Sequence, residues 1–483
     1  MINQNIKSNI KVLKYENQKN IKSRSLKMEE NIDLFKKILT QIEDKVDYAD
    51  IRAGKGNNTS IIMKDNQIQE INTGLSTVAR IRVLNNGAWG FASTNDFSKL
   101  EEISEKAIKI SNSLTGDIEL AECEIIKDNV KTDRKIAVSD VSIEDKKELI
   151  QDANKASNVG KVVSTTVSYS DGESTSAFVS TEGSEILIDS SRVALALNAV
   201  ASNGELIQFN HGSLGGVKGF EVLQDADIES FGRKIGDKAT ELLDAKPAPS
   251  GRFTIVADNN LTGVFIHEAV GHAVEADLVL QDDSILHDQM NKKIGSDIVN
   301  IYDDSSYKDG FGYYPYDVEG VKTRKNQIVK NGELVSFLTS RESAGKLNIP
   351  LTGNARSSIS DQPIVRMSNT FLEPGELSFE ELIEDIKDGI YLKGSRGGQV
   401  DTGKGIFQFN ASEAYQIENG ELKDHFRDVS LSGNILETLK AVDGIGSDFK
   451  LSVGYCGKGG QTAPVGDGGP HTRILNAMVG GSS

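Results

Sequence analysis

Two histidines in this chain are five residues apart, a spacing at which a regular α-helix cannot bring both side chains to one metal ion. They lie in the segment His267-Glu268-Ala269-Val270-Gly271-His272, within residues 261–280, which have the length and apolar content of a helix. At about 100° per residue, α-helical positions 267 and 272 point about 140° apart, whereas residues four apart differ by about 40°. The spacing therefore predicts a helix widened by one residue, as in a π-bulge, or broken there, with Gly271 best able to absorb the change.

The residue types in this segment are those of a zinc hydrolase. Two imidazoles can hold the cation, and the carboxylate of Glu268 can accept a proton from its bound water. The alternative is a pair of core or surface histidines that never meet a metal. A catalytic zinc site also needs a third protein ligand.

The best candidate for the third ligand is Cys456, which is flanked by glycines that let the backbone come close to a buried site. The other cysteine, Cys123, fits an ordinary small core residue. The remaining nitrogen donors are weaker candidates because their sequence surroundings suggest ordinary polar positions: His211, His287, His425 and His471.

Composition limits the classes of protein to consider. The 483 residues include 54 Lys and Arg against 71 Asp and Glu, a net charge of −17, which disfavours nucleic acid as a partner. No apolar run is long enough to cross a membrane, so no membrane association is expected. The two cysteines form no disulfide framework and suit a reducing compartment, which predicts a cytoplasmic protein.

The chain is expected to form an α+β protein of two domains. Residues 1–27 are predicted to be a disordered basic tail, residues 28–245 an α+β domain with an antiparallel sheet, and residues 246–483 a mostly β domain that carries the histidine helix. The boundary is placed at Lys246-Pro247-Ala248-Pro249, where two of the eight prolines lie. Helices are predicted at 32–46, 97–111, 143–156 and 227–243. Turns are predicted at Asn85-Asn86-Gly87, Asp171-Gly172, Glu182-Gly183 and Asn203-Gly204.

Several further blocks, in this order along the chain, resemble the TldD/PmbA family of zinc metalloproteases, specifically its metal-bearing TldD branch. The resemblance covers most of the chain from about Met28 onward. Besides residues 267–272, it rests on 82–84 with 89–93, Thr352-Gly353-Asn354-Ala355-Arg356, Gly397-Gly398-Gln399-Val400-Asp401, 412–415 with 417–420, and Cys456-Gly457-Lys458 with Gln461.

This resemblance implies one zinc ion per chain, held by His267, His272 and Cys456, with Glu268 catalytic. It implies cleavage of short or unfolded polypeptides. It also implies a dimer, either a homodimer or a heterodimer with a PmbA-type paralogue that lacks the metal motif.

The predicted function is that of a zinc metallopeptidase in which Glu268 activates the zinc-bound water and passes the proton to the leaving amine. We expect an extended substrate to lie along Gly397-Gly398, with Gln399 and Asp401 lining the groove. Arg356, Tyr415 and Lys458 are candidates for stabilising the oxyanion, and Arg356 is also a predicted substrate-binding residue. Two alternatives stay open: a non-catalytic binding or scaffold subunit with structural zinc, and a zinc hydrolase of non-peptide amides or esters.

Overall fold

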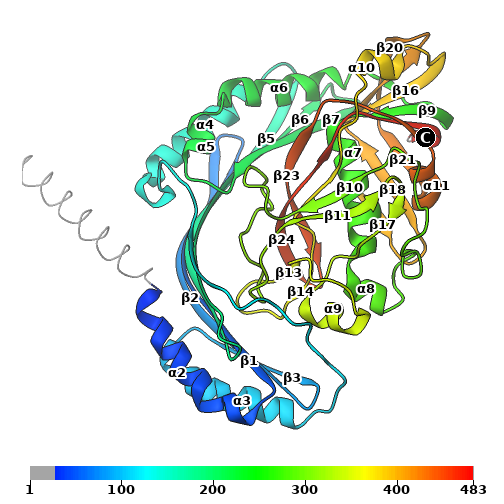
Figure 1. Cartoon of the computed structure of the whole chain (residues 1–483). Coiled ribbons are helices and arrows are strands. Elements are labelled where there is room, and N and C mark those ends of the chain that lie inside the picture. The colour runs from blue at the N-terminus through cyan, green and yellow to red at the C-terminus, as the bar shows by residue number, and fades with distance from the viewer. Residues whose placement is uncertain (1–27, 482–483) are drawn as a thin grey trace, which may run out of the picture.

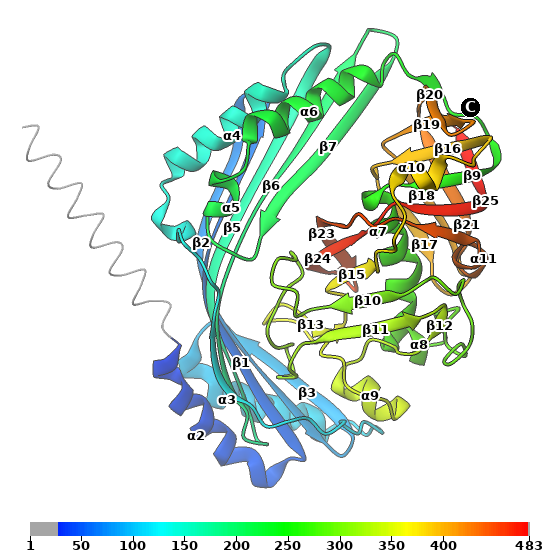
Figure 2. The same ribbon diagram turned by 45° about the horizontal axis from the view of Figure 1, so that its top comes forward.

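A long, curved sheet forms one side of the molecule, and the C-terminal half lies against its inner face (Figure 1, Figure 2). The structure, a computed structural model, describes residues 28–481, so the predicted tail 1–27 lies outside the described residues. The long sheet has seven strands in the order β3-β2-β1-β5-β6-β4, with β7 also paired to β6, and only the β4–β6 pair is parallel. Its strands are β1 (Tyr48–Lys64), β2 (Gln67–Asn85), β3 (Ala88–Thr94), β4 (Lys127–Lys131), β5 (Val162–Ser180), β6 (Glu185–Ser202) and β7 (Ile207–Gly216).

Two groups of helices cover the outer face of this sheet (Figure 2). Near one end, the apolar side chains of α2 and α3, including Phe35 and Leu100, pack on β1, β2 and β5 around Ile51 and Ile81. Near the other end, α4 and α6 pack on β1, β5 and β6. The predicted helices are therefore confirmed, with small shifts at their ends: α2 (Ile32–Ile42), α3 (Leu100–Asn112), α4 (Ile143–Ser157) and α6 (Ile228–Glu241). A short additional helix, α5 (Glu221–Gln224), precedes α6.

The C-terminal half is built on a ten-stranded sheet, a six-stranded sheet and one separate strand pair. The ten-stranded sheet contains β8 (Lys246–Pro247), β9 (Gly251–Ala257), β16 (Asp388–Lys393), β17 (Gly398–Asp401), β18 (Ile406–Ala411), β19 (Glu413–Glu418), β20 (Glu421–Arg427), β21 (Val429–Asn434), β22 (Val442–Ile445) and β25 (Thr472–Gly481). The six-stranded sheet contains β10 (Ile301–Asp304), β11 (Lys325–Lys330), β12 (Glu333–Leu334), β15 (Asn369–Leu372), β23 (Lys450–Lys458) and β24 (Gln461–Gly469). The pair is β13 (Ala355–Arg356) with β14 (Ile364–Val365). The short helices of this half include α9 (Arg341–Leu347), α10 (Phe379–Ile383) and α11 (Ile435–Lys440).

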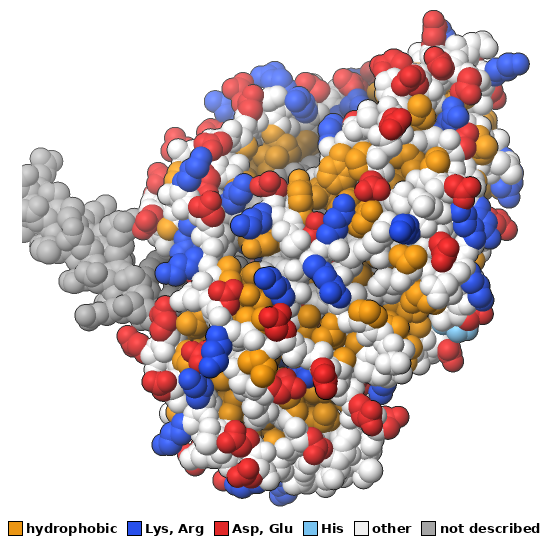
Figure 3. All heavy atoms as spheres, in the orientation of Figure 1, with side chains coloured by type: hydrophobic (Ala, Val, Ile, Leu, Met, Phe, Trp, Pro, Cys, Tyr) orange, Lys and Arg blue, Asp and Glu red, His pale blue; other side chains and the backbone are white. Residues whose placement is uncertain are grey.

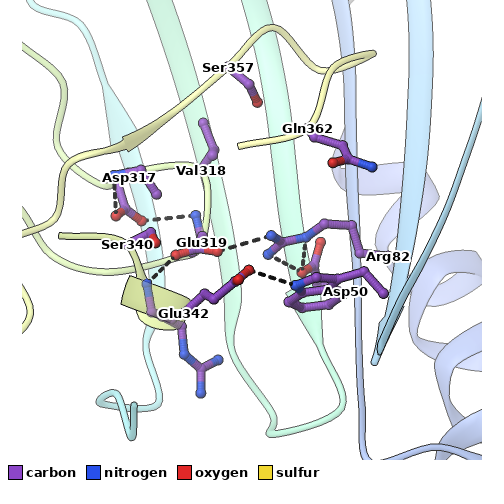
Figure 4. A network of polar contacts seen from close by, with 12 residues as sticks. Asp50, Arg82, Asp317, Val318, Glu319, Ser340, Glu342, Ser357 and Gln362 are labelled. Carbon is purple, nitrogen blue, oxygen red and sulfur yellow. Dashed lines mark hydrogen bonds and ion pairs between the residues drawn. The ribbon is translucent and has the colours of Figure 1, made fainter. Parts of the chain in front are cut away.

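Buried charges connect the long sheet to the C-terminal half (Figure 4). Arg82 on β2 donates to Asp50 on β1 at 2.6 Å and to Glu319 of the C-terminal half at 2.9 Å. Arg80 donates to the carbonyl oxygens of Val318 and Asp361. Removing one partner of a buried ion pair costs roughly 3–5 kcal/mol, so these contacts fix how the two halves sit.

One predicted turn is wrong. Asp171-Gly172 lies inside β5, not between strands. The carboxylate of Asp171, which favours turns when it can bond to its own backbone, instead pairs with Lys146 at 2.6 Å and accepts from the Tyr169 hydroxyl. The strand therefore runs on through this position, while the other three predicted turns are present.

The face seen in Figure 1 carries charges of both signs, spread over both halves, and is hollowed between α6 and the C-terminal half (Figure 3). Within residues 28–481, no helix combines the length and the apolar character needed to span a bilayer.

Candidate metal centre

The segment after β9 changes its winding at the first histidine. It begins as α7 (Asn259–Phe265), widens into a π-helical turn over Ile266–Gly271, tightens to a 3₁₀ turn over His272–Val274 and ends as α8 (Ala276–Leu280). The backbone N–H of His272 donates to the carbonyl of His267, five residues earlier, which is the π-helical bond. The widened turn that the histidine spacing predicts is thus present, and the 261–280 helix is not regular.

Gly271 serves the turn in a different way from the one expected. Its φ of −56° is ordinary for a helix, so no special backbone freedom is used. A Cβ at this position would instead lie 1.9 Å from the sulfur of Met367, which is fully buried. The missing side chain lets Met367 pack directly on the turn. The turn itself lies between the two large sheets, against β17 on one side and β15 and β24 on the other.

The turn brings both imidazoles to the thiol of Cys456. One ligand atom from each of His267, His272 and Cys456 lies within 4.8 Å of the other two. The Cys456 sulfur is 3.2 Å from Nε2 of His272, and the two imidazole rings are nearly perpendicular, with centroids 5.3 Å apart. Cys456 comes from β23, the edge strand of the six-stranded sheet, so residues far apart in sequence meet here.

This cluster has the chemistry of a zinc site. Two nitrogens and one sulfur form a common donor set for zinc, and Nδ1 of His267 is buried with no hydrogen-bond partner among the described residues. No fourth His, Cys, Asp or Glu joins the three in the part of the chain that the structure describes, as expected for a site that keeps one position open.

Behind His272 lies a chain of charged groups that sequence reasoning missed. Nδ1 of His272 is 3.0 Å from the carboxylate of Glu275, which is fully buried. Lys458 in turn contacts Glu275 at 3.0 Å and Asp277 at 2.6 Å. A carboxylate on the second nitrogen fixes the orientation of a metal-binding imidazole. The clue to this contact in the sequence is the position of Glu275, three residues after His272, because residues three apart lie on the same side of a helical turn.

The two imidazoles differ in their affinity for protons. Burial and the neighbouring His272 hold the pKa of His267 well below its usual range. Burial also opposes protonation of His272, but its contacts with Cys456 and Glu275 outweigh that effect and raise its pKa to about 10. A cation bound by Nε2 of His272 would take the place of that proton.

Glu268 lies beside the cluster of His267, His272 and Cys456 without belonging to it. Its carboxylate is 3.8 Å from Nε2 of His272, and its side chain stays 29% exposed. Burial raises its pKa above the usual value. A second carboxylate, Asp467 on β24, was also missed from the sequence: burial and then the charge of Glu268 raise its pKa to about 7. Asp467 lines a cavity of about 920 Å³ between β7 and β23.

The other histidines considered as ligands bind elsewhere. His287 contacts the carbonyl of Ser284, His425 contacts Glu413, and His471 contacts Asp448 and Tyr391. His211, on β7, lines the 920 Å³ cavity, and burial lowers its pKa. Only Cys456 joins the two motif histidines among residues 28–481.

The predicted substrate-binding residues are spread over different places. Gly397 lines the 920 Å³ cavity, with nothing within 4 Å of where its Cβ would be. Gly398 offers no such room, because Phe409 fills the space of its missing side chain. Gln399 pairs with Gln408 along the β17 edge, and Asp401 binds Lys404.

The three candidates for the oxyanion have internal partners. Arg356 donates to the carbonyls of Met367 and Pro464, and Tyr415 donates to Glu413. Lys458 is held by the two carboxylates behind His272. Arg366, which was not singled out from the sequence, donates to the Cys456 carbonyl and supports the ligand strand.

Comparison with known proteins covers almost the whole described chain. Three models of PmbA/TldA metallopeptidase domains match it: domain 1 over residues 49–111, the central domain over 136–243 and the C-terminal domain over 250–481. A protein of Methanothermobacter thermautotrophicus named metalloprotease is 58% identical over 94% of this chain and 100% of its own length. A zinc metalloprotease TldD homolog of Saccharolobus solfataricus is 32% identical over 93% of this chain and 100% of its own length.

Solved structures share the fold. TldE from Thermococcus kodakarensis superposes with a TM-score of 0.74 at 19% identity, covering 92% of this chain and 99% of its own. A Thermotoga maritima protein described as a candidate modulator of DNA gyrase gives a TM-score of 0.76 at 21% identity, covering 93% and 100%. With the family models and the sequence relatives, these matches show that the chain belongs to the TldD/PmbA family.

Proposed function

We propose that this protein is a zinc metallopeptidase that hydrolyses peptide bonds in short or unfolded polypeptides. The observation that carries the proposal is the meeting of two imidazoles and one thiol within 4.8 Å, with the carboxylate of Glu268 beside them. His267, His272 and Cys456 would hold one zinc ion per chain. When bound, zinc would supply a positive charge that acidifies water and polarises a carbonyl.

Glu268 is the proposed general base and then the general acid. Its carboxylate takes a proton from the attacking water, holds it while the tetrahedral adduct exists and gives it to the nitrogen of the leaving amine. Burial supports this role, because it raises the pKa of Glu268 towards the range where one group can both accept and release a proton. Glu275 and Lys458 keep His272 oriented and take no part in proton transfer.

An extended peptide fits the surroundings of the site. The β17 edge lies beside the π-helical turn and pairs only with β18 among the described strands, so its outer edge can accept the backbone of a substrate. Gly397 leads from this edge into the 920 Å³ cavity, and Gln399 and Asp401 continue along it. Recognition through backbone hydrogen bonds would be largely independent of sequence.

The two alternatives predict different results. A structural zinc would need a fourth protein ligand, and none joins the cluster among residues 28–481. A hydrolase of non-peptide amides or esters would leave an unstructured peptide intact. Hydrolysis of such a peptide by zinc-loaded protein, lost with a chelator, supports the peptidase; no hydrolysis by fully zinc-loaded protein contradicts it.

The proposed role of Glu268 predicts a separation between metal binding and turnover. We expect Glu268→Gln to retain zinc and to lose at least 100-fold in kcat on an unstructured peptide, because general acid–base catalysis contributes roughly 10²–10⁴-fold. Metal analysis and peptide turnover on the same preparation test this. Retention of most of the activity would show that Glu268 is not the base.

The proposed ligand set predicts unequal effects of the two cysteines. Loss of a residue behind a ligand typically lowers metal affinity by roughly 10–100-fold, so we expect Cys456→Ser, which alters a ligand itself, to lower zinc affinity by at least that much. Cys123 lies in the N-terminal half and contacts Glu182, so Cys123→Ser is the matched control and should leave zinc affinity unchanged. Equal affinities of Cys456→Ser and wild type would remove Cys456 from the site.

We also propose that the chain works as a dimer, with itself or with a PmbA-type chain, whose interface closes over the metal. A peptidase that does not read sequence must exclude folded proteins, and an interface that closes over the metal would do so. Light scattering after size exclusion should give a dimer, alone or with such a paralogue. A monomer that digests folded globular proteins would contradict restricted access.

A further inference from the structure

A second cavity, of about 310 Å³, lies between the long sheet and the C-terminal half and is unusually rich in cations. Its lining includes four basic side chains, Arg52, Lys131, Arg192 and Arg356, against two acidic ones, Asp189 and Asp317. The chain as a whole has an excess of acidic over basic residues, 71 against 54, so this lining reverses the general balance.

The three guanidinium groups have no carboxylate partner within ion-pair distance among the described residues. Each donates only to backbone carbonyls: Arg52 to Ser357 at 3.1 Å, Arg192 to Phe311 and Tyr313, and Arg356 to Met367 and Pro464. Nε of Arg192 is buried and has no hydrogen-bond partner within residues 28–481. A buried cation without a counter-charge is costly, so the cavity favours an anion.

The acidic side chains of the lining form no ion pair with these arginines among the described residues. Both oxygens of Asp189 are taken by Arg134, at 2.5 and 3.1 Å. The Asp317 carboxylate accepts the backbone N–H groups of Glu319, Val321 and Ala355. None of the three arginines is therefore held in an ion pair by the described residues, although the charge of Asp317 acts on Arg52 and that of Asp303 on Arg356.

Burial and neighbouring charges act on the protonation of these arginines. Burial, followed by the charge of Arg356, lowers the pKa of Arg192 to about 10. Burial lowers the pKa of Arg52 to about 10 and outweighs the opposite effect of the charges of Asp317 and Asp50. Aromatic rings hold two of these groups in place: the guanidinium carbon of Arg356 lies 4.8 Å from the ring centre of Tyr314, and that of Arg192 lies 5.2 Å from Phe311.

The cavity reaches β24, the strand paired with the one that carries Cys456. Pro464, which accepts from Arg356, lies opposite Tyr455 on the neighbouring strand, one residue before the ligand Cys456. A third cavity, of about 390 Å³, shares Arg192, Ser174, Ser190 and Pro464 with this one and reaches Tyr455, which also lines the 920 Å³ cavity. The three cavities thus follow one another along the inner face of the long sheet.

We propose that Arg52, Arg192 and Arg356 form a carboxylate-binding site that anchors the substrate peptide while its scissile bond lies at Glu268. The inference rests on the proposed peptidase function for the identity of the ligand. A guanidinium fork matches a carboxylate, and the cavity holds several such donors beside serine hydroxyls. The carboxylate is either the C-terminus of the peptide or an acidic side chain, and the two sources are separable.

Binding to the zinc-loaded Glu268→Gln protein tests the site without turnover. Three N-acetylated six-residue peptides of Ala and Ser are compared by calorimetry: one with a free C-terminal carboxylate, one with a C-terminal amide, and one amide with a single internal Asp. Charge-assisted hydrogen bonds are worth roughly tenfold or more in affinity, so at least one carboxylate peptide should bind about tenfold more tightly than the neutral amide. Preference for the free acid identifies the C-terminus, and preference for the Asp peptide identifies an acidic side chain.

Arg192→Met, added to the same protein, should abolish this preference and leave the affinity for the neutral amide unchanged, which also shows that the protein is folded. Arg192→Lys should retain part of the preference. The control is Arg233→Met on α6, an exposed arginine paired with Glu229, which should keep all of it. Equal binding of all three peptides, no measurable binding, or a preference that survives Arg192→Met would overturn the site.

The proposed function can fail separately from this inference. If zinc-loaded wild type hydrolyses all three peptides, including the one with the internal Asp, with the same KM, the peptidase function stands and the carboxylate site is wrong. If it hydrolyses neither, while Arg192 still governs a carboxylate preference in binding, the site stands and the peptidase function is wrong.

Discussion

The candidate metal centre depends on one backbone hydrogen bond, from the N–H of His272 to the carbonyl of His267. This bond makes a π-helical turn, which reduces the angular offset of the two histidines from about 140° to about 50°. Both imidazoles then face the thiol on β23. The turn persists because two sheets enclose it and because Gly271 leaves room for Met367, so the packing of the C-terminal half stabilises a winding that an isolated helix would avoid.

The contact between the two halves of the molecule has a different character. Each half has its own apolar core, whereas the contact between them includes buried ion pairs such as Asp50–Arg82–Glu319 (Figure 4) and the cavities along the inner face of the long sheet. Polar walls suit a peptide backbone, which must keep its hydrogen bonds when it leaves water. The long sheet, through β7, provides one wall of the 920 Å³ cavity that Asp467 also lines.

The local elements and the meeting of His267, His272 and Cys456 could be predicted from the sequence, because each depends on residues close together or on rare residue types. The helical spacing of Phe35 and the neighbouring apolar residues predicted α2, and the spacing of His267 and His272 predicted a widened turn. Glu275, Asp467 and the arginine cavity were missed, since their roles come from contacts between strands and halves far apart in the chain. The roles predicted for Gly271 and Gly398 were wrong, because the sequence does not show which neighbouring side chain occupies the space beside a glycine.

X-ray absorption at the zinc edge of the metal-loaded protein tests the central claim most directly, because it reports the atoms bound to the ion. The claim predicts a first shell with one sulfur at about 2.3 Å and two imidazole nitrogens at about 2.0–2.1 Å, with the remaining position taken by a light atom from solvent. A shell without sulfur, or with a single imidazole, would show that the π-helical turn does not bring His267, His272 and Cys456 to one ion.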